Sequence, residues 1–567
     1  MKIHFTRSFA VAALGTLAIA QAPTVLVHVS SGGIQGNGAA IATPTLGVSD
    51  DGSVIAFASA ASNLVAGDAN GVMDIFVRDR ALSTTELVSC ALTGVPGNAL
   101  SQSPTASDDG RYVAFESTAS NLVAADGNGQ SDVFLRDRLL GTTTRLSEPQ
   151  GGGDANGASS DPFVSGNGRF VSFSSMATNL VPNDLNARAD IFVLDLTTGA
   201  IVLASIDTNG VQGNLDSRTS CLSDDGTVVA FTSNSTNLWP NDGNGHMDTF
   251  VRDLTTNTTV AASLTPAGST ASNGTSSNLA ISGDGAFVAF SSRSQELGSE
   301  PNRLEIYVYD RVAATTTLVS RSFMGVQSGG SDQPSLSDDG RYVAFHSDSN
   351  KLVNLDFGPK SDIFVVDLTN GEVTRASMDM NGDNAVSDST GATLSGDGRC
   401  VAYASAANDL VPNDLNSTWD VFAHDLTRTQ PVAYCWNKTS GQGCTPFVFP
   451  TGVPSASQPN GFQIEGRLIK TNAPGLLIYG GAPNNAPFLD GTLCVLPPIR
   501  RGPPLIASGT GTCGGTFQFD FNTWIAGGSD PALSAGDVVY AQYWFRDTVS
   551  PPFFAGLTDA VRFVIEP

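Results

Sequence analysis

Residues 107–116 of the chain read SDDGRYVAFE, and residues 132–137 read DVFLRD. The first stretch is a Ser-Asp-Asp-Gly turn followed by a run in which polar and apolar residues alternate, and the second stretch alternates in the same way. Alternation at period two is typical of β-strands with two different faces, and Asp-Gly is a preferred hairpin turn. This region therefore predicts a small antiparallel sheet.

The same unit recurs along most of the chain at intervals of 55 to 59 residues. Its marker is a turn that begins with Ser and ends with Gly, and the seven copies are Ser49–Gly52, Ser107–Gly110, Ser165–Gly168, Ser223–Gly226, Ser282–Gly285, Ser337–Gly340 and Ser395–Gly398. In the second copy the four strand-like runs are Ser103–Ser107, Arg111–Glu116, Asp132–Asp137 and Thr143–Ser147. Four antiparallel strands in each of seven units predict an all-β fold, a seven-bladed β-propeller over residues 21–430.

The segment Thr24–Ser30 precedes the first complete unit and resembles the fourth strand of a unit, such as Thr316–Ser320. A propeller leaves no open sheet edge. We therefore predict that this segment pairs in the last blade, beside the strand around Val421–Asp425.

The first 20 residues have the features of a secretory signal peptide. Lys2 and Arg7 precede the apolar run Phe9–Ala20, which ends in a small-residue cleavage pattern and is shorter than the about 20 residues of a membrane span. We expect a mature chain that begins near Gln21, has no transmembrane segment and is secreted, periplasmic or displayed on a bacterial cell surface. Such compartments permit disulfides.

The repeat resembles a known family through its Ser-x-Asp-Gly turns followed by Val113–Phe115 (VAF) or Val171–Phe173 (VSF). These residues are similar to the WD40-like, or PD40, repeats of TolB-type propellers, over about residues 24–430. The resemblance implies the fold and says little about function. TolB has an α/β domain ahead of its propeller that is not seen in this sequence, so the envelope role of TolB is not carried over.

Charge and motifs narrow the classes of function. With 29 basic and 54 acidic residues the net charge is −25, which argues against nucleic acid or an anionic membrane as the main partner. The histidines after the signal peptide (His28, His246, His346 and His424) occupy different repeat positions, and no catalytic motif is present. We expect no catalytic residues and no cofactor apart from calcium.

The leading hypothesis is a monomeric, non-enzymatic protein for binding or scaffolding at the cell surface or envelope. Its protein or glycan ligand would lie on the face that carries the longer loops, such as Ala119–Ser131 and Thr208–Arg218, because binding residues usually sit on loops held by a rigid scaffold. The alternative is an enzyme that acts on polysaccharide or peptide at the mouth of the channel. Converging His, Glu, Arg or Lys residues at one place in the ring would favour the enzyme.

Two sets of acidic residues have simple structural explanations. The paired acids of the Ser-Asp-Asp-Gly turns, such as Asp50-Asp51 and Asp108-Asp109, are hairpin turn residues. One Asp comes directly before the turn after the third strand in every unit, and these residues are Asp79, Asp137, Asp195, Asp253, Asp310, Asp367 and Asp425. Asp in such positions hydrogen-bonds turn backbone.

A third acidic pattern, D-x-N-x-x-x-D, lies in the loop between strands two and three. The copies are Asp68/Asn70/Asp74, Asp126/Asn128/Asp132, Asp184/Asn186/Asp190, Asp242/Asn244/Asp248 and Asp414/Asn416/Asp420. Oxygen ligands at positions 1, 3 and 7 resemble the start of a calcium-binding loop, which would need further oxygens from backbone and water. The alternative is structural: Asp and Asn cap turns, and the last Asp starts a strand.

Beyond the repeats we predict a linker over residues 431–460 and a β-sandwich-like domain over residues 461–567. The segment resembles a C-terminal module of secreted bacterial proteins through Tyr434-Cys435, Gln442–Pro446, Tyr479-Gly480, Ala541–Asp547 and Leu557–Ala560, which implies sorting or attachment. The aromatic residues Tyr540, Tyr543, Trp544 and Phe545 fit a core, or a surface that stacks on a sugar.

The seven cysteines fall into two groups. We predict two disulfides among Cys435, Cys444, Cys494 and Cys513, most simply Cys435–Cys444 and Cys494–Cys513, although the sequence allows three pairings. Cys90, Cys221 and Cys400 lie in different blades at unequal repeat positions. We interpret these three as buried free thiols.

Overall fold

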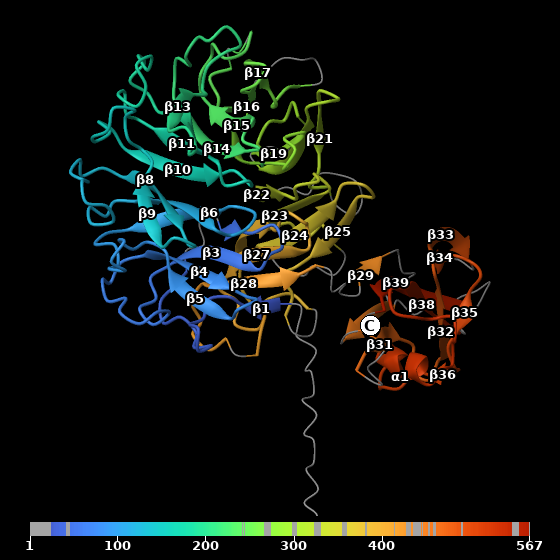
Figure 1. Ribbon diagram of the computed structural model, residues 1–567. Helices are drawn as coiled ribbons and strands as arrows, with labels where there is room; N and C mark the ends of the chain where they lie inside the picture. Colours follow the sequence, from blue (N-terminus) through green and yellow to red (C-terminus); the bar gives the residue numbers. More distant parts are fainter. Residues whose placement is uncertain are drawn as a thin grey trace, which may run out of the picture.

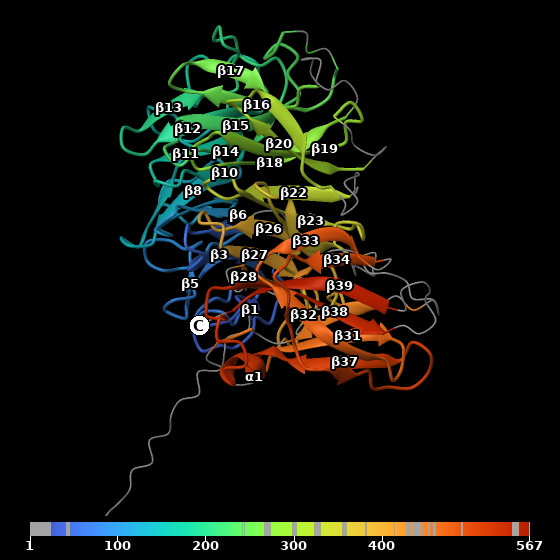
Figure 2. The same cartoon turned by 90° about the vertical axis from the view of Figure 1, so that its right-hand side faces the viewer.

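The computed structural model describes residues 24–565 except 41–45, 241, 243, 266–273, 298–302, 322–329, 354–359, 380–382, 413, 427–431, 435–443, 445, 452–453, 457–460, 489–490 and 547–554. The predicted signal peptide and Cys435 lie outside the described residues. Figure 1 shows a ring of sheets next to a second group of strands, and Figure 2 shows both from the side.

Seven four-stranded antiparallel sheets form the blades of a β-propeller (Figure 1). Blade 1 consists of β2 (Gly47–Val48), β3 (Val54–Ser59), β4 (Asp74–Asp79) and β5 (Thr84–Leu87). Blade 2 consists of β6 (Ser101–Ala106), β7 (Tyr112–Ser117), β8 (Asp132–Asp137) and β9 (Thr142–Arg145). Blade 3 consists of β10 (Ser159–Val164), β11 (Phe170–Ser175), β12 (Asp190–Asp195) and β13 (Ala200–Leu203). Blades 4 and 5 are β14 (Ser217–Leu222), β15 (Val228–Ser233), β16 (Asp248–Asp253) and β17 (Thr258–Ala261); β18 (Ser276–Ile281), β19 (Phe287–Ser292), β20 (Glu305–Asp310) and β21 (Thr315–Leu318). Blades 6 and 7 are β22 (Ser331–Leu336), β23 (Tyr342–Ser347), β24 (Asp362–Asp367) and β25 (Glu372–Arg375); β26 (Ser389–Leu394), β27 (Cys400–Ser405), β28 (Asp420–Asp425) and β1 (Thr24–Leu26). The predicted fold is confirmed.

The N-terminal strand closes the ring as predicted. Strand β1 pairs antiparallel with β28, so that Thr24 lies opposite His424. The ring of His28, just beyond β1, is buried between the carboxylate of Asp420 in blade 7 and the hydroxyl of Ser59 in blade 1, with 2.7 Å between Nε2 and Ser59 Oγ. The first and last repeats are therefore joined by backbone and side-chain hydrogen bonds.

Aromatic pairs fill the middle of each blade. Phe57 of β3 stacks on Phe76 of β4 with 6.0 Å between the ring centroids, and Phe115 and Phe134 repeat this contact in blade 2. All these rings are fully buried, because neighbouring blades cover both faces of each sheet. The VAF and VSF motifs are thus the packing surface between blades.

The C-terminal strands form two packed sheets and a hairpin, as predicted for a sandwich-like module. They are β29 (Val432–Tyr434), β30 (Phe447–Thr451), β31 (Gln463–Ile469), β32 (Pro474–Gly480), β33 (Pro483–Phe488), β34 (Gly491–Val495), β35 (Arg500–Arg501), β36 (Leu505–Ile506), β37 (Gly515–Asp520), β38 (Val538–Arg546) and β39 (Ala555–Val564). The larger sheet has the order β29-β39-β38-β32-β35 with β36 also on β32, and the smaller has the order β30-β31-β37. Because β29 and β30 belong to these sheets, the C-terminal sheets begin before residue 461.

The two C-terminal sheets share one hydrophobic core. Phe517 of the smaller sheet stacks on Tyr543 of the larger one at 5.1 Å, and both are buried together with Phe545. Tyr543 and Phe545 therefore have the predicted core position. A short helix, α1 (Phe521–Ala526), follows β37 and was not predicted; the side chain of Asp520 caps it by accepting a hydrogen bond from the Thr523 N–H at 2.9 Å.

The predicted disulfide pairs Cys435–Cys444 and Cys494–Cys513 are wrong, because Cys444 bonds Cys513. Strands β30 and β37 flank β31 and are both antiparallel to it, so their first residues lie at the same end of the sheet. Cys444 and Cys513 precede these two strands and meet there. Cys494 is also disulfide-bonded, and Cys90, Cys221 and Cys400 are buried free thiols as predicted.

The C-terminal module contacts the propeller at blade 6, where the Arg562 guanidinium of β39 lies 3.3 Å from the Glu372 carboxylate of β25. Within the described ranges no helix has the length and apolar character needed to cross a membrane.

Candidate functional site: the central channel

The channel of the propeller has two different ends. We call the end with the seven Ser-x-x-Gly turns the turn end and the opposite end, with the longer loops, the loop end. At the turn end one backbone N–H of each turn donates to a carbonyl of the next turn over 2.8–3.0 Å, through the pairs Asp50–Asp108, Asp108–Gly166, Asn167–Asp224, Asp224–Gly283, Gly283–Asp338, Asp338–Gly396 and Asp397–Asp50. These seven hydrogen bonds form a closed ring that fixes the width of the channel.

The second residue of each turn lies on this ring, and it is Asp in four blades and Gly in three. In order round the ring these residues are Asp50, Asp108, Gly166, Asp224, Gly283, Asp338 and Gly396. A Cβ atom at Gly166 would lie 2.2 Å from Asp108 Oδ2, and one at Gly396 would lie 2.1 Å from Asp338 Oδ2. The glycines therefore leave the space into which the neighbouring carboxylates extend.

Carboxylate oxygens of Asp108, Asp224 and Asp338 lie within 4.8 Å of one another at the turn end. Burial, together with the neighbouring carboxylates, raises the pKa of Asp108 and Asp338 to about 7. The same causes raise the pKa of Asp224 and Asp50. We call these four residues the acidic ring. Its carboxylates lose solvation and repel one another, so the ring favours a positive group beside it.

The third residue of each turn has a different role, and here the turn explanation is correct. Asp109 Oδ1 accepts hydrogen bonds from the Ser107 hydroxyl at 2.6 Å and the Arg111 N–H at 2.9 Å. Asn167 makes the same two contacts in blade 3. The prediction that both acids of the Ser-Asp-Asp-Gly turn are hairpin turn residues is therefore correct for the third position of the turn only. The missed signal was the alternation of Asp and Gly at the second position alone.

Above the acidic ring the channel widens into a cavity of about 230 Å³ lined by the innermost strands. Six of these strands have a residue with positive φ at the same place, namely Ser103 (53°), Asp161 (51°), Thr219 (37°), Asn278 (38°), Gln333 (54°) and Gly391 (69°). Five of the six are not glycine, so this backbone is strained. At these positions the regular hydrogen-bond ladder between strands is interrupted, and polar residues line the wall of the cavity.

At the loop end, the residues around the mouth of the channel differ in type between blades. The penultimate residues of the second strands are Ala58, Glu116, Ser174, Thr232, Ser291, His346 and Ala404. Glu116 is buried and accepts hydrogen bonds from Gln102 and from the Asp161 N–H at 3.0 Å. Burial raises the pKa of both Glu116 and Asp161, although the Arg218 guanidinium nearby favours the charged form of Asp161. These residues form one acidic side of the mouth.

The other side of the mouth is in blades 5 and 6. The Asn278 amide donates to Asp332 Oδ1 at 2.9 Å, and burial lowers the pKa of His346, which is near Asp332. Gln333 Oε1 and His346 Nδ1 are buried atoms without a hydrogen-bond partner. Of the residues at the mouth, only Arg218 belongs to a loop that was predicted to carry the ligand. Glu116 and His346 lie in strands, where alternation along the sequence does not distinguish them.

The aspartates at the ends of the third strands cap the following turns, as predicted. Backbone N–H groups donate to their carboxylates in the pairs Leu82–Asp79 (2.7 Å), Leu139–Asp137 (3.0 Å), Thr197–Asp195 (2.9 Å), Thr255–Asp253 (2.9 Å), Val312–Asp310 (2.8 Å) and Thr369–Asp367 (2.9 Å). Asp425 has partners of its own.

In the D-x-N-x-x-x-D loops the structure brings the first and last Asp of each loop near each other. Burial raises the pKa of the last acids Asp74, Asp190 and Asp248 to about 6. Burial also raises the pKa of first acids, and the groups affected are Asp68, Asp126 and Asp414. In blades 1 to 4 the last Asp accepts a hydrogen bond from a serine that follows strand four, as Asp132 does from Ser147 at 2.5 Å.

The asparagines of these loops cap turns, which is the structural alternative to metal ligation. The Oδ1 atom of each accepts from the N–H two residues later, in the pairs Val72–Asn70 (3.1 Å), Gln130–Asn128 (2.8 Å), Arg188–Asn186 (2.8 Å), His246–Asn244 (2.7 Å) and Thr418–Asn416 (2.9 Å). Each of these oxygens therefore serves its own turn, as the structural alternative expects.

The amide nitrogens of the same asparagines hold the loops together. Those of Asn128 and Asn244 donate to the last Asp of their own loop, at 2.9 Å to Asp132 and 2.7 Å to Asp248. Those of Asn186 and Asn416 donate to a carbonyl of the neighbouring inter-blade loop, at 2.8 Å to Gly213 and 3.0 Å to Gly36. The asparagines therefore stabilise these loops, and calcium binding by the acids and asparagines of the motif stays a prediction.

No family model and no curated protein matches the sequence. Solved structures with a similar fold include an oligogalacturonate lyase from Vibrio parahaemolyticus, 11% identical over 69% of this chain and 91% of that one, with a TM-score of 0.43. TolB from Acinetobacter baumannii is 17% identical over 57% of this chain and 64% of its own, with a TM-score of 0.34. The propeller domain of the Trilobed protease from Pyrococcus furiosus is 11% identical over 68% and 96%, with a TM-score of 0.41. These similarities concern the propeller fold.

Proposed function

We propose that this protein is an exported, non-enzymatic propeller whose central channel binds a positively charged group, such as a Lys or Arg side chain of a protein or peptide partner. The observation that carries this proposal is the convergence of the acidic ring on a cavity. Asp108, Asp224 and Asp338 come from three separate blades, and their carboxylates meet below the cavity.

Electrostatics favour this ligand over an anion or an apolar group. A positive group beside the ring would relieve the repulsion between its carboxylates and stabilise their charged forms. The backbone ring holds the carboxylates in place before binding, so little ordering is required. The cavity of about 230 Å³ is below the roughly 300–1,000 Å³ of pockets that enclose drug-sized ligands, which suits one side chain or a small amine.

Titration calorimetry with tri-lysine and tri-arginine peptides, and with tri-glutamate for comparison, tests the proposal. The triple variant Asp108→Asn, Asp224→Asn, Asp338→Asn should bind the basic peptides at least about tenfold more weakly, a loss of about 1.4 kcal/mol. Tri-glutamate should not bind to either protein.

A matched control is available in the same turns. Asp109→Asn, Asp225→Asn and Asp339→Asn together remove the same number of carboxyl groups, and Asn167 shows that Asn caps this turn. This control should bind the basic peptides nearly as well as the original chain. Equal losses in the two triple variants would indicate a general charge effect and contradict a channel site.

The broken symmetry at the loop end favours the second candidate, an enzyme acting on polysaccharide or peptide. Glu116 is a candidate general acid, since burial raises its pKa and Arg218 lies on the same side of the mouth. Incubation with oligosaccharide and peptide libraries, followed by mass spectrometry, should then give cleavage products that Glu116→Gln abolishes. Absence of products would leave binding as the function.

A further inference from the structure

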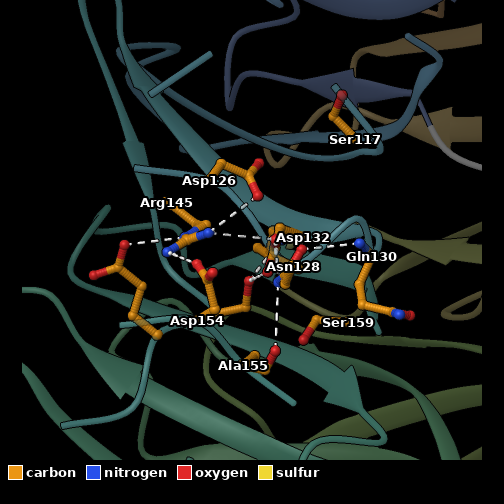
Figure 3. A network of polar contacts seen from close by, with 12 residues as sticks. Ser117, Asp126, Asn128, Gln130, Asp132, Arg145, Asp154, Ala155 and Ser159 are labelled. Carbon is orange, nitrogen blue, oxygen red and sulfur yellow. Dashed lines mark hydrogen bonds and ion pairs between the residues drawn. The ribbon is translucent and has the colours of Figure 1, made fainter. Parts of the chain in front are cut away.

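Beside the loop between strands two and three of blade 2, a buried arginine lies among carboxylates (Figure 3). Arg145, at the end of β9, is 5% exposed. Its Nη1 atom lies 3.2 Å from Asp126 Oδ1 and 3.7 Å from Asp132 Oδ2, which belong to the first and last acids of the D-x-N-x-x-x-D motif. Its other nitrogens contact Glu148 at 3.0 Å and Asp154 at 2.9 Å. In blade 2 a positive side chain therefore forms ion pairs with both acids of the motif.

Blade 3 has the same acid pair without the arginine. Leu203 takes the place of Arg145, since Leu203 lies opposite Phe192 in the sheet as Arg145 lies opposite Phe134. Asp184 is 4% exposed and Asp190 is fully buried. Two carboxylates are thus buried together where blade 2 has a guanidinium.

The side-chain donors to this pair in blade 3 are all neutral groups, Ser205, Asn186 and Gln212. The neutral amide of Gln212 donates to Asp184 Oδ1 at 2.8 Å and to Asp190 Oδ2 at 2.9 Å, and Ser205 donates to Asp190 Oδ1 at 2.5 Å. Asp184 Oδ2 is buried and has no hydrogen-bond partner. A buried charge without a positive partner or a full set of hydrogen bonds is costly.

We propose that the Asp184/Asp190 pair of blade 3 binds one calcium ion, which takes the role that Arg145 has in blade 2. Two carboxylates balance the charge of a divalent cation, and their hard oxygens suit calcium, with backbone carbonyls and water as the remaining ligands. The ion competes with the Gln212 amide for the same oxygens. In blade 2 the Arg145 guanidinium already occupies this position, so no ion binds there.

The test compares the calcium bound per chain in the full-length protein after EDTA treatment and dialysis against millimolar calcium. Asp184→Asn keeps the shape and an oxygen acceptor for Gln212, and it should bind one ion fewer than the original chain. Asp126→Asn in blade 2 is the matched control and should bind the same number as the original chain.

A second variant imitates blade 2 directly. Leu203→Arg supplies a guanidinium to the pair, so it should also lose one ion, and its melting temperature should respond less to EDTA. If Leu203→Arg fails to fold, the comparison of Asp184→Asn with Asp126→Asn still decides. Equal calcium in Asp184→Asn and the original chain, or no calcium in either, would overturn the proposal.

Discussion

At the scale of single residues, two adjacent positions in one turn have opposite electrostatics. The third residue accepts hydrogen bonds from its own turn; burial alone would raise the pKa of Asp225, but these bonds lower it. The second residue points toward the same kind of residue in other blades, and burial and mutual repulsion raise the pKa of Asp108. One position stabilises its turn, while the other makes the channel acidic.

The raised pKa of Asp108 predicts a pH-dependent gain for Asp108→Asn. A carboxyl whose pKa is raised from 3.8 to about 7 on folding contributes stability below about pH 4 that is lost as the pH rises through 7. Asn imitates the neutral form. The variant should therefore be more stable than the original chain at pH 8 by about 1–3 kcal/mol, after allowance for solvent screening, and equal to it at pH 4.

Urea unfolding at the two pH values measures this difference. Asp109→Asn is the control, because it leaves the channel carboxylates in place and should not gain stability between pH 4 and pH 8. A gain for Asp108→Asn that is the same at both pH values would contradict the assigned cause.

At the scale of elements, the order of strands explains features that spacing along the chain does not. Cys444 and Cys513 are 69 residues apart, yet they precede the two outer strands of the same three-stranded sheet. From the sequence, a bridge between Cys444 and Cys435 is the simplest prediction, because separation along the chain is the only measure of distance that a sequence provides. Pairing of β30 and β37 with β31 brings the distant cysteine closer.

Cys444→Ser with Cys513→Ser should destabilise the C-terminal module by about 2–5 kcal/mol and leave the propeller unchanged. The bridge constrains a long loop in the unfolded module, but the blades contain no part of it. Calorimetry under non-reducing conditions should show a lower melting transition for one unit alone. Loss of both transitions together would mean that the two units unfold as one.

At the scale of the whole molecule, the propeller depends on a closure made by few residues. In blades 1 to 4 a serine that follows strand four donates to the first acid of strand three, as Ser89 does to Asp74 at 2.6 Å. In the closing blade His28 takes the place of this serine and also reaches Ser59 of blade 1. The imidazole is long enough to link two blades, which a serine hydroxyl is not.

His28→Ser should therefore cost more than the loss of an ordinary cap. It removes the link to Ser59 and leaves a void beside Gly36, so the free energy of unfolding should fall by about 2–4 kcal/mol. Ser89→Ala, which removes a cap inside one blade, should cost about 1 kcal/mol. Urea unfolding of both variants measures the difference, and equal losses would show that closure does not depend on His28.

The repeated blade, its turns, the closing strand and the free thiols could all be predicted from the sequence. These follow from alternation, turn residues and repeat register, which act over a few neighbouring residues or recur at a fixed period. The folded chain was needed to show that Asp108, Asp224 and Asp338 meet and that Cys444 bonds Cys513. It was also needed to show that Arg145 pairs with one set of acids while Asp184 keeps an unpaired oxygen. These contacts join residues from different blades or strands, and their distances are set by the radius of the ring and the order of the sheets.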